Sequence, residues 1–113
     1  MHELSLAMEV IELAKREVAK RGFGVVTEIN LEAGELSGVD VEAFRFALEM
    51  SVPGTILQNA RIDLRQLPGT GFCETCHSEF PMHGRSDGCP GCGIIPFEIR
   101  GGTEFRVVSL VAE

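Results

Sequence analysis

The four cysteines of this chain form two C-x-x-C pairs, Cys73 with Cys76 and Cys89 with Cys92. A gap of two residues lets a tight turn direct both thiolates at one metal ion, and two such turns complete a tetrahedral site with no open position. A closed site of four sulfurs is typical of structural rather than catalytic zinc. The spacing therefore predicts one structural zinc ion held by all four cysteines.

The turn that carries the second pair reads Cys-Pro-Gly-Cys-Gly. Pro90 fixes one backbone angle, and Gly91 and Gly93 permit the positive φ angles expected where a chain wraps around a sulfur. Disulfides and free thiols are the other uses of paired cysteines. Close paired spacing without a recognisable secretory signal favours metal over both.

Three other metal sites fit part of the cysteine pattern. Cys73 to His77 matches the C-x-x-C-H sequence of c-type haem attachment, but that site would leave Cys89 and Cys92 without a role. A rubredoxin-like iron site would use the same four sulfurs, because tetrahedral thiolates suit iron as well as zinc. A zinc ribbon that binds nucleic acid would need clustered cations, whereas Arg85 is the one Lys or Arg between the first and last cysteine.

A second group of possible metal ligands stands at the start of the chain, Met1-His2-Glu3. The free amine, the backbone nitrogen of His2 and its imidazole can close small chelate rings on one ion, and Glu3 can supply a further donor. Nitrogen and oxygen donors in a tetragonal arrangement suit Ni(II) or Cu(II). A solvated terminal histidine is the alternative interpretation, and the residues alone leave both open.

Composition limits the classes of partner. The 113 residues fit one domain, or one domain with a small appendage, and 44% hydrophobic residues are enough for a core. A net charge of −7 argues against nucleic acid and anionic membranes as partners. No apolar run approaches the roughly eighteen residues of a membrane span, and the acidic N-terminal segment is unlike a signal peptide. The expected location is the cytoplasm.

Two helices are expected before the cysteines. From about Leu4 to Arg21 apolar residues recur at steps of three and four, and Gly22 is a natural stop. Asp40 is a candidate N-cap for a second helix that ends at about Ser51. The pattern of apolar residues gives each helix one face to bury.

Three strands complete the expected fold, over about Val25–Ala33, Ile56–Leu67 and Thr103–Val111. These elements predict an α+β fold with two helices on one face of a small, about three-stranded sheet. Residues 70–96 hold few apolar groups and read as a zinc-ribbon-like loop inserted before the last strand, disordered without its metal. The expected domains are therefore residues 1–69 with 97–113, which would bind nickel, and residues 70–96, which would bind zinc.

The whole chain resembles the HypA/HybF family, nickel chaperones for NiFe-hydrogenase maturation. The resemblance rests on Met1-His2-Glu3-Leu4-Ser5, on Gly34-Glu35-Leu36-Ser37-Gly38-Val39 and on the two cysteine pairs. It implies that His2 is the principal nickel ligand with the Met1 amine and Glu3 beside it, and that the four cysteines hold structural zinc. It also implies delivery of nickel to the hydrogenase large subunit together with a HypB-type GTPase. Some family members place a histidine after each cysteine pair, whereas here Gly93 follows the second.

The leading hypothesis is thus a metallochaperone, which binds and delivers Ni(II) and is not an enzyme. No phosphate-binding glycine loop and no Ser-His-Asp grouping stands out in the sequence. A three-histidine catalytic site would have to join His2, His77 and His83 from opposite parts of the chain. The alternatives from other classes are a rubredoxin-like iron electron carrier and a zinc-ribbon scaffold that only docks proteins.

Overall fold

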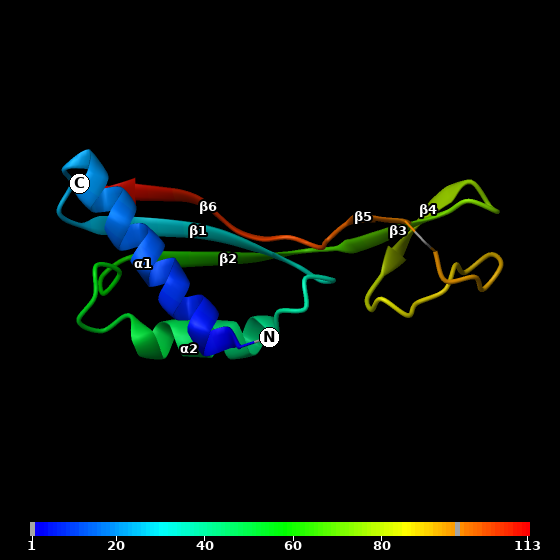
Figure 1. Cartoon of the computed structure of the whole chain (residues 1–113), viewed down its shortest axis with the longest axis horizontal. Helices are drawn as coiled ribbons and strands as arrows, with labels where there is room; N and C mark the ends of the chain where they lie inside the picture. The colour runs from blue at the N-terminus through cyan, green and yellow to red at the C-terminus, as the bar shows by residue number, and fades with distance from the viewer. Residues whose placement is uncertain (1, 97) are drawn as a thin grey trace.

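The structure is a computed structural model that describes residues 2–96 and 98–113. Two helices and six strands follow one another in the order α1 (Glu3–Arg21), β1 (Val26–Gly34), α2 (Val41–Ser51), β2 (Arg61–Leu67), β3 (Gly69–Cys73), β4 (Ser78–Met82), β5 (Glu98–Gly101) and β6 (Phe105–Ala112). The strands form two separate three-stranded sheets, and the molecule is elongated, 54 × 24 × 17 Å (Figure 1). None of its described helices is long and apolar enough to cross a membrane.

The first sheet has the order β2-β1-β6. β1 runs parallel to β2 and antiparallel to β6, so that Leu31 in the central strand lies opposite Leu64 on one side and Val107 on the other. The last strand therefore returns to the first sheet as the sequence predicts, and it pairs Phe105 with Ala33 of β1, which lies far away in the sequence.

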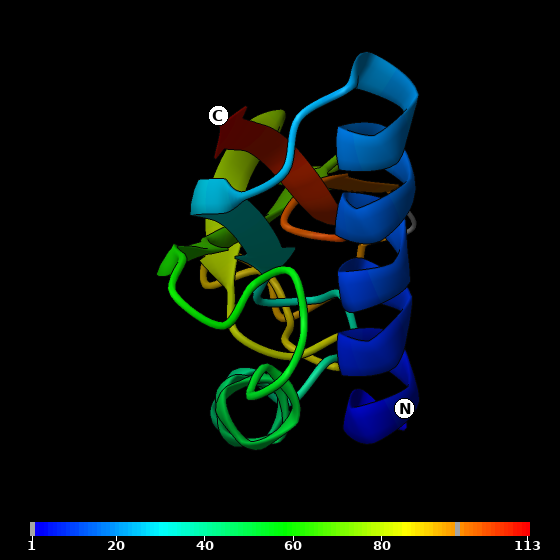
Figure 2. The same ribbon diagram turned by 90° about the vertical axis from the view of Figure 1, so that its left-hand side faces the viewer.

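Both helices cover the same face of this sheet (Figure 2). Ile29 and Leu31 of β1 are fully buried against Ala7 and Ala14 of α1 and against Phe44 of α2. The Phe44 ring also meets Phe105 of β6 edge to face, with centroids 4.9 Å apart. The predicted α+β class, with two helices on one face of a three-stranded sheet, is confirmed.

The helix ends follow the sequence signals. Gly22 ends α1 in the left-handed conformation at φ 76°, and the Asp40 carboxylate caps α2 by accepting the N–H of Ala43 at 3.1 Å. The strand expected from Ile56 is shorter and begins at Arg61. Turns replace its first part, because the Gln58 side chain accepts the Gly54 N–H at 2.6 Å and holds the chain in a local loop.

The zinc-ribbon-like segment expected around the cysteines contains a second sheet, of order β4-β3-β5, whose strands the sequence pattern did not reveal. Alternate residues Phe80 and Met82 of β4 are buried with Leu36, which projects from the turn after β1. Residues 98–101 were expected with the first sheet but pair with β3 instead. The division of the chain into a nickel-binding and a zinc-binding domain remains a prediction, and β5 places the end of the second sheet beyond residue 96.

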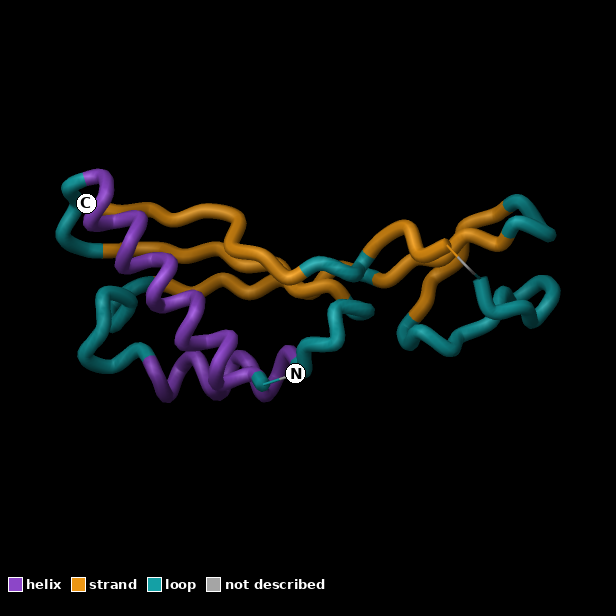
Figure 3. Tube along the Cα trace, viewed as in Figure 1, coloured by secondary structure: helices purple, strands orange, loops and turns teal. Residues whose placement is uncertain are grey.

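The two sheets meet where backbones touch (Figure 3). Only Pro68 separates β2 from β3, so one extended run of chain passes from the first sheet into the second. At the crossing, a Cβ atom on Gly34 would overlap the backbone carbonyl of Gly102, and a Cβ atom on Gly102 would meet Gly69. Glycine is required here because two backbones occupy the space of a side chain.

Candidate metal centre

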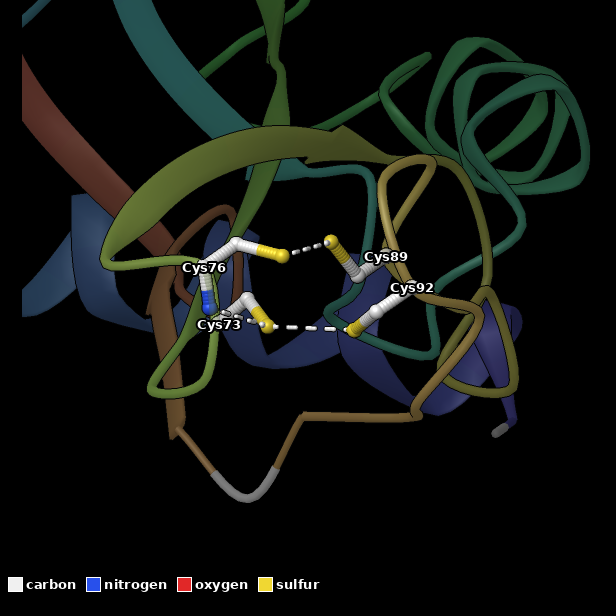
Figure 4. Close-up of side chains that lie close together, drawn as sticks. All are labelled: Cys73, Cys76, Cys89 and Cys92. Atoms are coloured by element: carbon white, nitrogen blue, oxygen red, sulfur yellow. Dashed lines mark hydrogen bonds between the residues drawn. The ribbon is translucent and has the colours of Figure 1, made fainter.

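The second sheet and the loop beside it bring the four cysteines together (Figure 4). Cys73 ends β3 and Cys76 lies in the turn to β4, whereas Cys89 and Cys92 come from the long connection between β4 and β5. All four sulfur atoms lie within 4.8 Å of one another. Cys73 and Cys89 are buried, while Cys76 and Cys92 are exposed, so the cluster sits at the surface with one thiol of each pair turned inward.

The spacing of the sulfurs fits a tetrahedral ion. The Cys73 and Cys92 sulfurs are 3.5 Å apart, and the Cys76 and Cys89 sulfurs are 3.9 Å apart. Four thiolates about 2.3 Å from one zinc ion at tetrahedral angles would lie roughly 3.8 Å from each other. The four-sulfur set therefore suits a metal such as zinc, which would be closed off from substrate.

Backbone N–H groups point at the inward sulfurs. The Cys76 N–H donates to Cys73 Sγ at 3.4 Å, and the Gly91 N–H donates to Cys89 Sγ at 3.3 Å. Gly93 has a φ of 79°, as the sequence suggests, but Gly91 does not adopt a positive φ. Gly91 is needed for space instead, because a Cβ atom there would lie 3.3 Å from Cys76 Sγ.

These contacts separate the acidities of the thiols. The pKa of Cys73 falls to about 7, mainly because the Cys76 N–H donates a hydrogen bond to its sulfur. Burial of the thiol opposes this change. The pKa of Cys76 rises to about 12, because its thiol is hydrogen-bonded to the neighbouring sulfurs, first that of Cys92 and then that of Cys89. Metal ligation requires thiolates, so an ion that binds at this site would release protons.

The loop that carries the second cysteine pair is tied back to the first sheet. The Arg85 guanidinium donates to the Leu36 carbonyl at 2.8 Å, and His83 Nδ1 lies 2.6 Å from a carboxylate oxygen of Glu35. The other Glu35 oxygen accepts the Gly69 N–H at 3.0 Å. Sequence reasoning missed these contacts because nothing local marks residues that meet across 34 to 49 positions.

Two of the predicted N-terminal ligands, His2 and Glu3, lie at the start of α1 beside α2 (Figure 1). His2 is the N-cap residue of α1, is exposed, and makes no side-chain capping bond. Glu3 begins the helix, and its carboxylate accepts the backbone N–H of Asp40 at 3.3 Å. Met1 lies outside the described residues. The hydrogen bond from Asp40 joins the start of α2 to the start of α1.

The fold and the four-sulfur cluster define a small α+β metal-binding protein. A family model described as "Hydrogenase/urease nickel incorporation, metallochaperone, hypA" matches residues 1–112. The hydrogenase maturation factor HypA of Parabacteroides distasonis is 41% identical over 111 residues, 98% of this chain and 96% of its own length. The factor of the same name from Geobacter sp. strain M21 is 41% identical over 113 residues, the full length of both chains.

The chain belongs to the HypA family, whose members are described as metallochaperones and hydrogenase maturation factors. The solution structure of the Ni metallochaperone HypA from Helicobacter pylori superimposes with a TM-score of 0.66 over 99% of this chain and 97% of that chain. At 24% identity this likeness establishes the shared fold. The family resemblance drawn from the sequence motifs is thereby confirmed.

Proposed function

We propose that this protein binds Ni(II) at its N-terminus and delivers it to the large subunit of a NiFe hydrogenase. The observation that carries the proposal is the position of His2. Its backbone carbonyl accepts the Leu6 N–H at 3.1 Å and so starts the helix, while its imidazole is exposed and takes no part in capping. A helix that fixes the backbone of a ligand but leaves the side chain accessible suits a cargo ion that must be released.

The ligands of this proposed site are the Met1 amine, the His2 nitrogens and Glu3. The amine and imidazole must lose their protons to bind, so nickel binding should release protons and weaken as pH falls. The Asp40 N–H holds the Glu3 carboxylate at the helix start. This contact would keep Glu3 near the imidazole and link the nickel site to the beginning of α2.

We assign the four-cysteine cluster to structural zinc. Its sulfurs form a closed set, and a closed set suits an ion that stays while the N-terminal ion is exchanged. The bound zinc would supply folding free energy to a sheet whose own core is small. Reduced thiols persist in a cytoplasmic environment, which is the location we propose.

The proposed partners are the hydrogenase large subunit, which receives the ion, and a HypB-type GTPase. The relatives' name, hydrogenase maturation factor, supports the first, and the family resemblance supports the second. The proposal includes neither nucleic acid nor membrane, in keeping with the net charge of −7.

Calorimetric nickel titration tests the N-terminal site. Native protein, protein extended by a few residues before Met1, and His2→Ala are compared at several pH values, with His77→Ala as a control histidine on the second sheet's turn. The extension and His2→Ala should both lose most of the nickel affinity, while His77→Ala keeps it and all variants keep their zinc. Equal nickel affinity in all four proteins would refute the N-terminal site.

A further inference from the structure

A long groove runs between helix α1 and strand β6. Its volume is about 970 Å³. One wall is the whole of β6, residues 105–112, and the other is a flank of α1 that carries Leu6, Val10 and Leu13. Leu13 is only half-buried and belongs to neither apolar core, so folding of the chain does not account for its position.

The β6 wall of the groove is an open sheet edge. β1 is the only described strand that pairs with β6, so the N–H and C=O groups on its other side have no strand partner within residues 2–96 and 98–113. The opposite edge of the same sheet, β2, reads Arg-Ile-Asp-Leu-Arg-Gln-Leu and is protected by charge. By contrast, β6 reads Phe-Arg-Val-Val-Ser-Leu-Val-Ala and has a single charged residue, Arg106.

We propose that this groove binds an extended segment of a partner protein, which adds to β6 as a fourth strand. An open edge offers backbone hydrogen bonds to any extended chain, and the adjoining helix flank selects its side chains. In an added strand, alternate side chains would face Leu6 and Leu13, so these positions should be apolar. The proposal concerns a surface distinct from the nickel and zinc sites and does not depend on either.

The charges of the groove select a basic segment. Glu9 and Glu17 line it from α1, and Arg21 offsets only Glu17, at 3.5 Å in an exposed pair. Arg106, which also lines the groove, is already paired with Glu32 at 2.8 Å and with Glu104 at 3.5 Å. A Lys or Arg on the added strand could therefore lay its stem along the helix flank and reach Glu9.

Charge also argues against a second copy of this chain as the occupant. Two copies each carrying −7 repel one another, and neither could offer a cation for Glu9 from its own β6, where Arg106 is already paired. The occupant that fits is thus an extended, apolar and basic peptide segment.

The probe is a fluorescein-labelled peptide with the length of β6, eight residues, that alternates valine with threonine and carries one lysine in place of a valine. Fluorescence anisotropy should show saturable binding to the full-length protein that weakens as salt rises. The same peptide with glutamate for lysine should bind at least about tenfold more weakly. A peptide with N-methylated alternate backbone amides should not bind, because it cannot form the strand hydrogen bonds.

Two variants place the binding in the groove. Leu13→Glu should weaken binding by about tenfold or more, whereas Met8→Glu, at an exposed apolar position on another flank of α1, should leave it unchanged. Glu9→Lys, at an exposed position, should weaken binding of the lysine peptide and strengthen binding of the glutamate peptide. Hydrogen exchange of β6 amides should slow when the lysine peptide is bound.

The proposal is overturned by any of four results. Three of them concern the lysine peptide: it does not bind, it binds Leu13→Glu as tightly as it binds native protein, or it protects amides outside β6. Reversible dimerisation of the native protein that protects β6 by itself would also overturn it, since the groove would then be an interface between copies of this chain.

Discussion

The Nδ1 atom of His83 lies 2.6 Å from Oε2 of Glu35, and this contact joins the loop after β4 to the turn after β1. It is one of the few side-chain links between the two sheets. Glu35 is also bonded to the Gly69 N–H, at the point where the chain passes from β2 into β3. The orientation of the cysteine-bearing segment relative to the helices therefore depends in part on one titratable pair.

The pH dependence of this pair follows from its pKa shifts. Glu35 raises the pKa of His83 above its usual 6.5, first by hydrogen bonding and then by charge. The pKa of Glu35 is lowered, first by the Gly69 N–H and next by His83. The contribution of His83 to folding stability is complete below pH 6.5 and is lost as pH rises through the raised pKa of His83. The contribution of Glu35 to folding stability is lost as pH falls through the lowered pKa of Glu35.

We expect Glu35→Gln to lower the His83 pKa measured by NMR titration, because the amide can still accept the Gly69 N–H but carries no charge. The change in melting temperature should be small, since His83 is three-quarters exposed and water screens the pair. An unchanged His83 pKa in the variant would show that the contact does not persist in solution.

Removal of one cysteine ligand should loosen the second sheet and spare the first. Cys76→Ser should lose most of the zinc, and its β3 and β4 amides should exchange faster, because the core there consists of little more than Leu36, Phe80 and Met82. Elemental analysis should find one zinc ion per native chain, and the protein should be colourless. A coloured protein that contains iron would favour the rubredoxin-like alternative, and full zinc in Cys76→Ser would contradict the ligand assignment.

Phe44 should be the most sensitive position in the first core. Phe44→Ala removes a fully buried ring that packs on Phe105, and we expect it to reduce the free energy of unfolding by about 3–5 kcal/mol. Phe46→Ala is the matched control on the same helix, because that ring is 66% exposed, and its effect should stay within about 0.5 kcal/mol. Denaturant unfolding of both variants measures the difference.

The backbone crossing between the sheets should not tolerate a side chain. Gly34→Ala should destabilise the protein by roughly 1–3 kcal/mol, because its Cβ atom would overlap the Gly102 carbonyl. Gly24→Ala is the control, since neither glycine has a positive φ and nothing lies within 4 Å of a Cβ atom at Gly24. Thermal melts that show equal stability for the two variants would mean that the sheets do not cross as closely as the structure has them.

The proposed GTPase partner should associate through complementary charge. The chain carries −7, so a partner with a basic patch should bind more weakly as salt rises. Analytical ultracentrifugation of the purified proteins at low and high salt, with and without nickel, measures this. No association at low salt under either condition would contradict the partnership.

The sequence by itself determined the local features of this protein. Apolar residues three and four apart specified α1, the Asp40 carboxylate specified the start of α2, and alternation specified β1, because each signal lies within a few neighbouring residues. The four cysteines were identifiable for the same reason, since a two-residue gap is enough to aim two sulfurs at one ion.

Only the tertiary structure decided how distant segments pair. β5 joins β3 rather than the first sheet, Glu35 meets His83 across 48 positions, and Asp40 reaches Glu3 across 37. The sequence carries no local mark of such contacts, because their free energy comes from packing and from backbone hydrogen bonds that any residue can form. The groove beside β6 is also a tertiary feature, since it exists only where one helix flank and one sheet edge are held apart by the core between them.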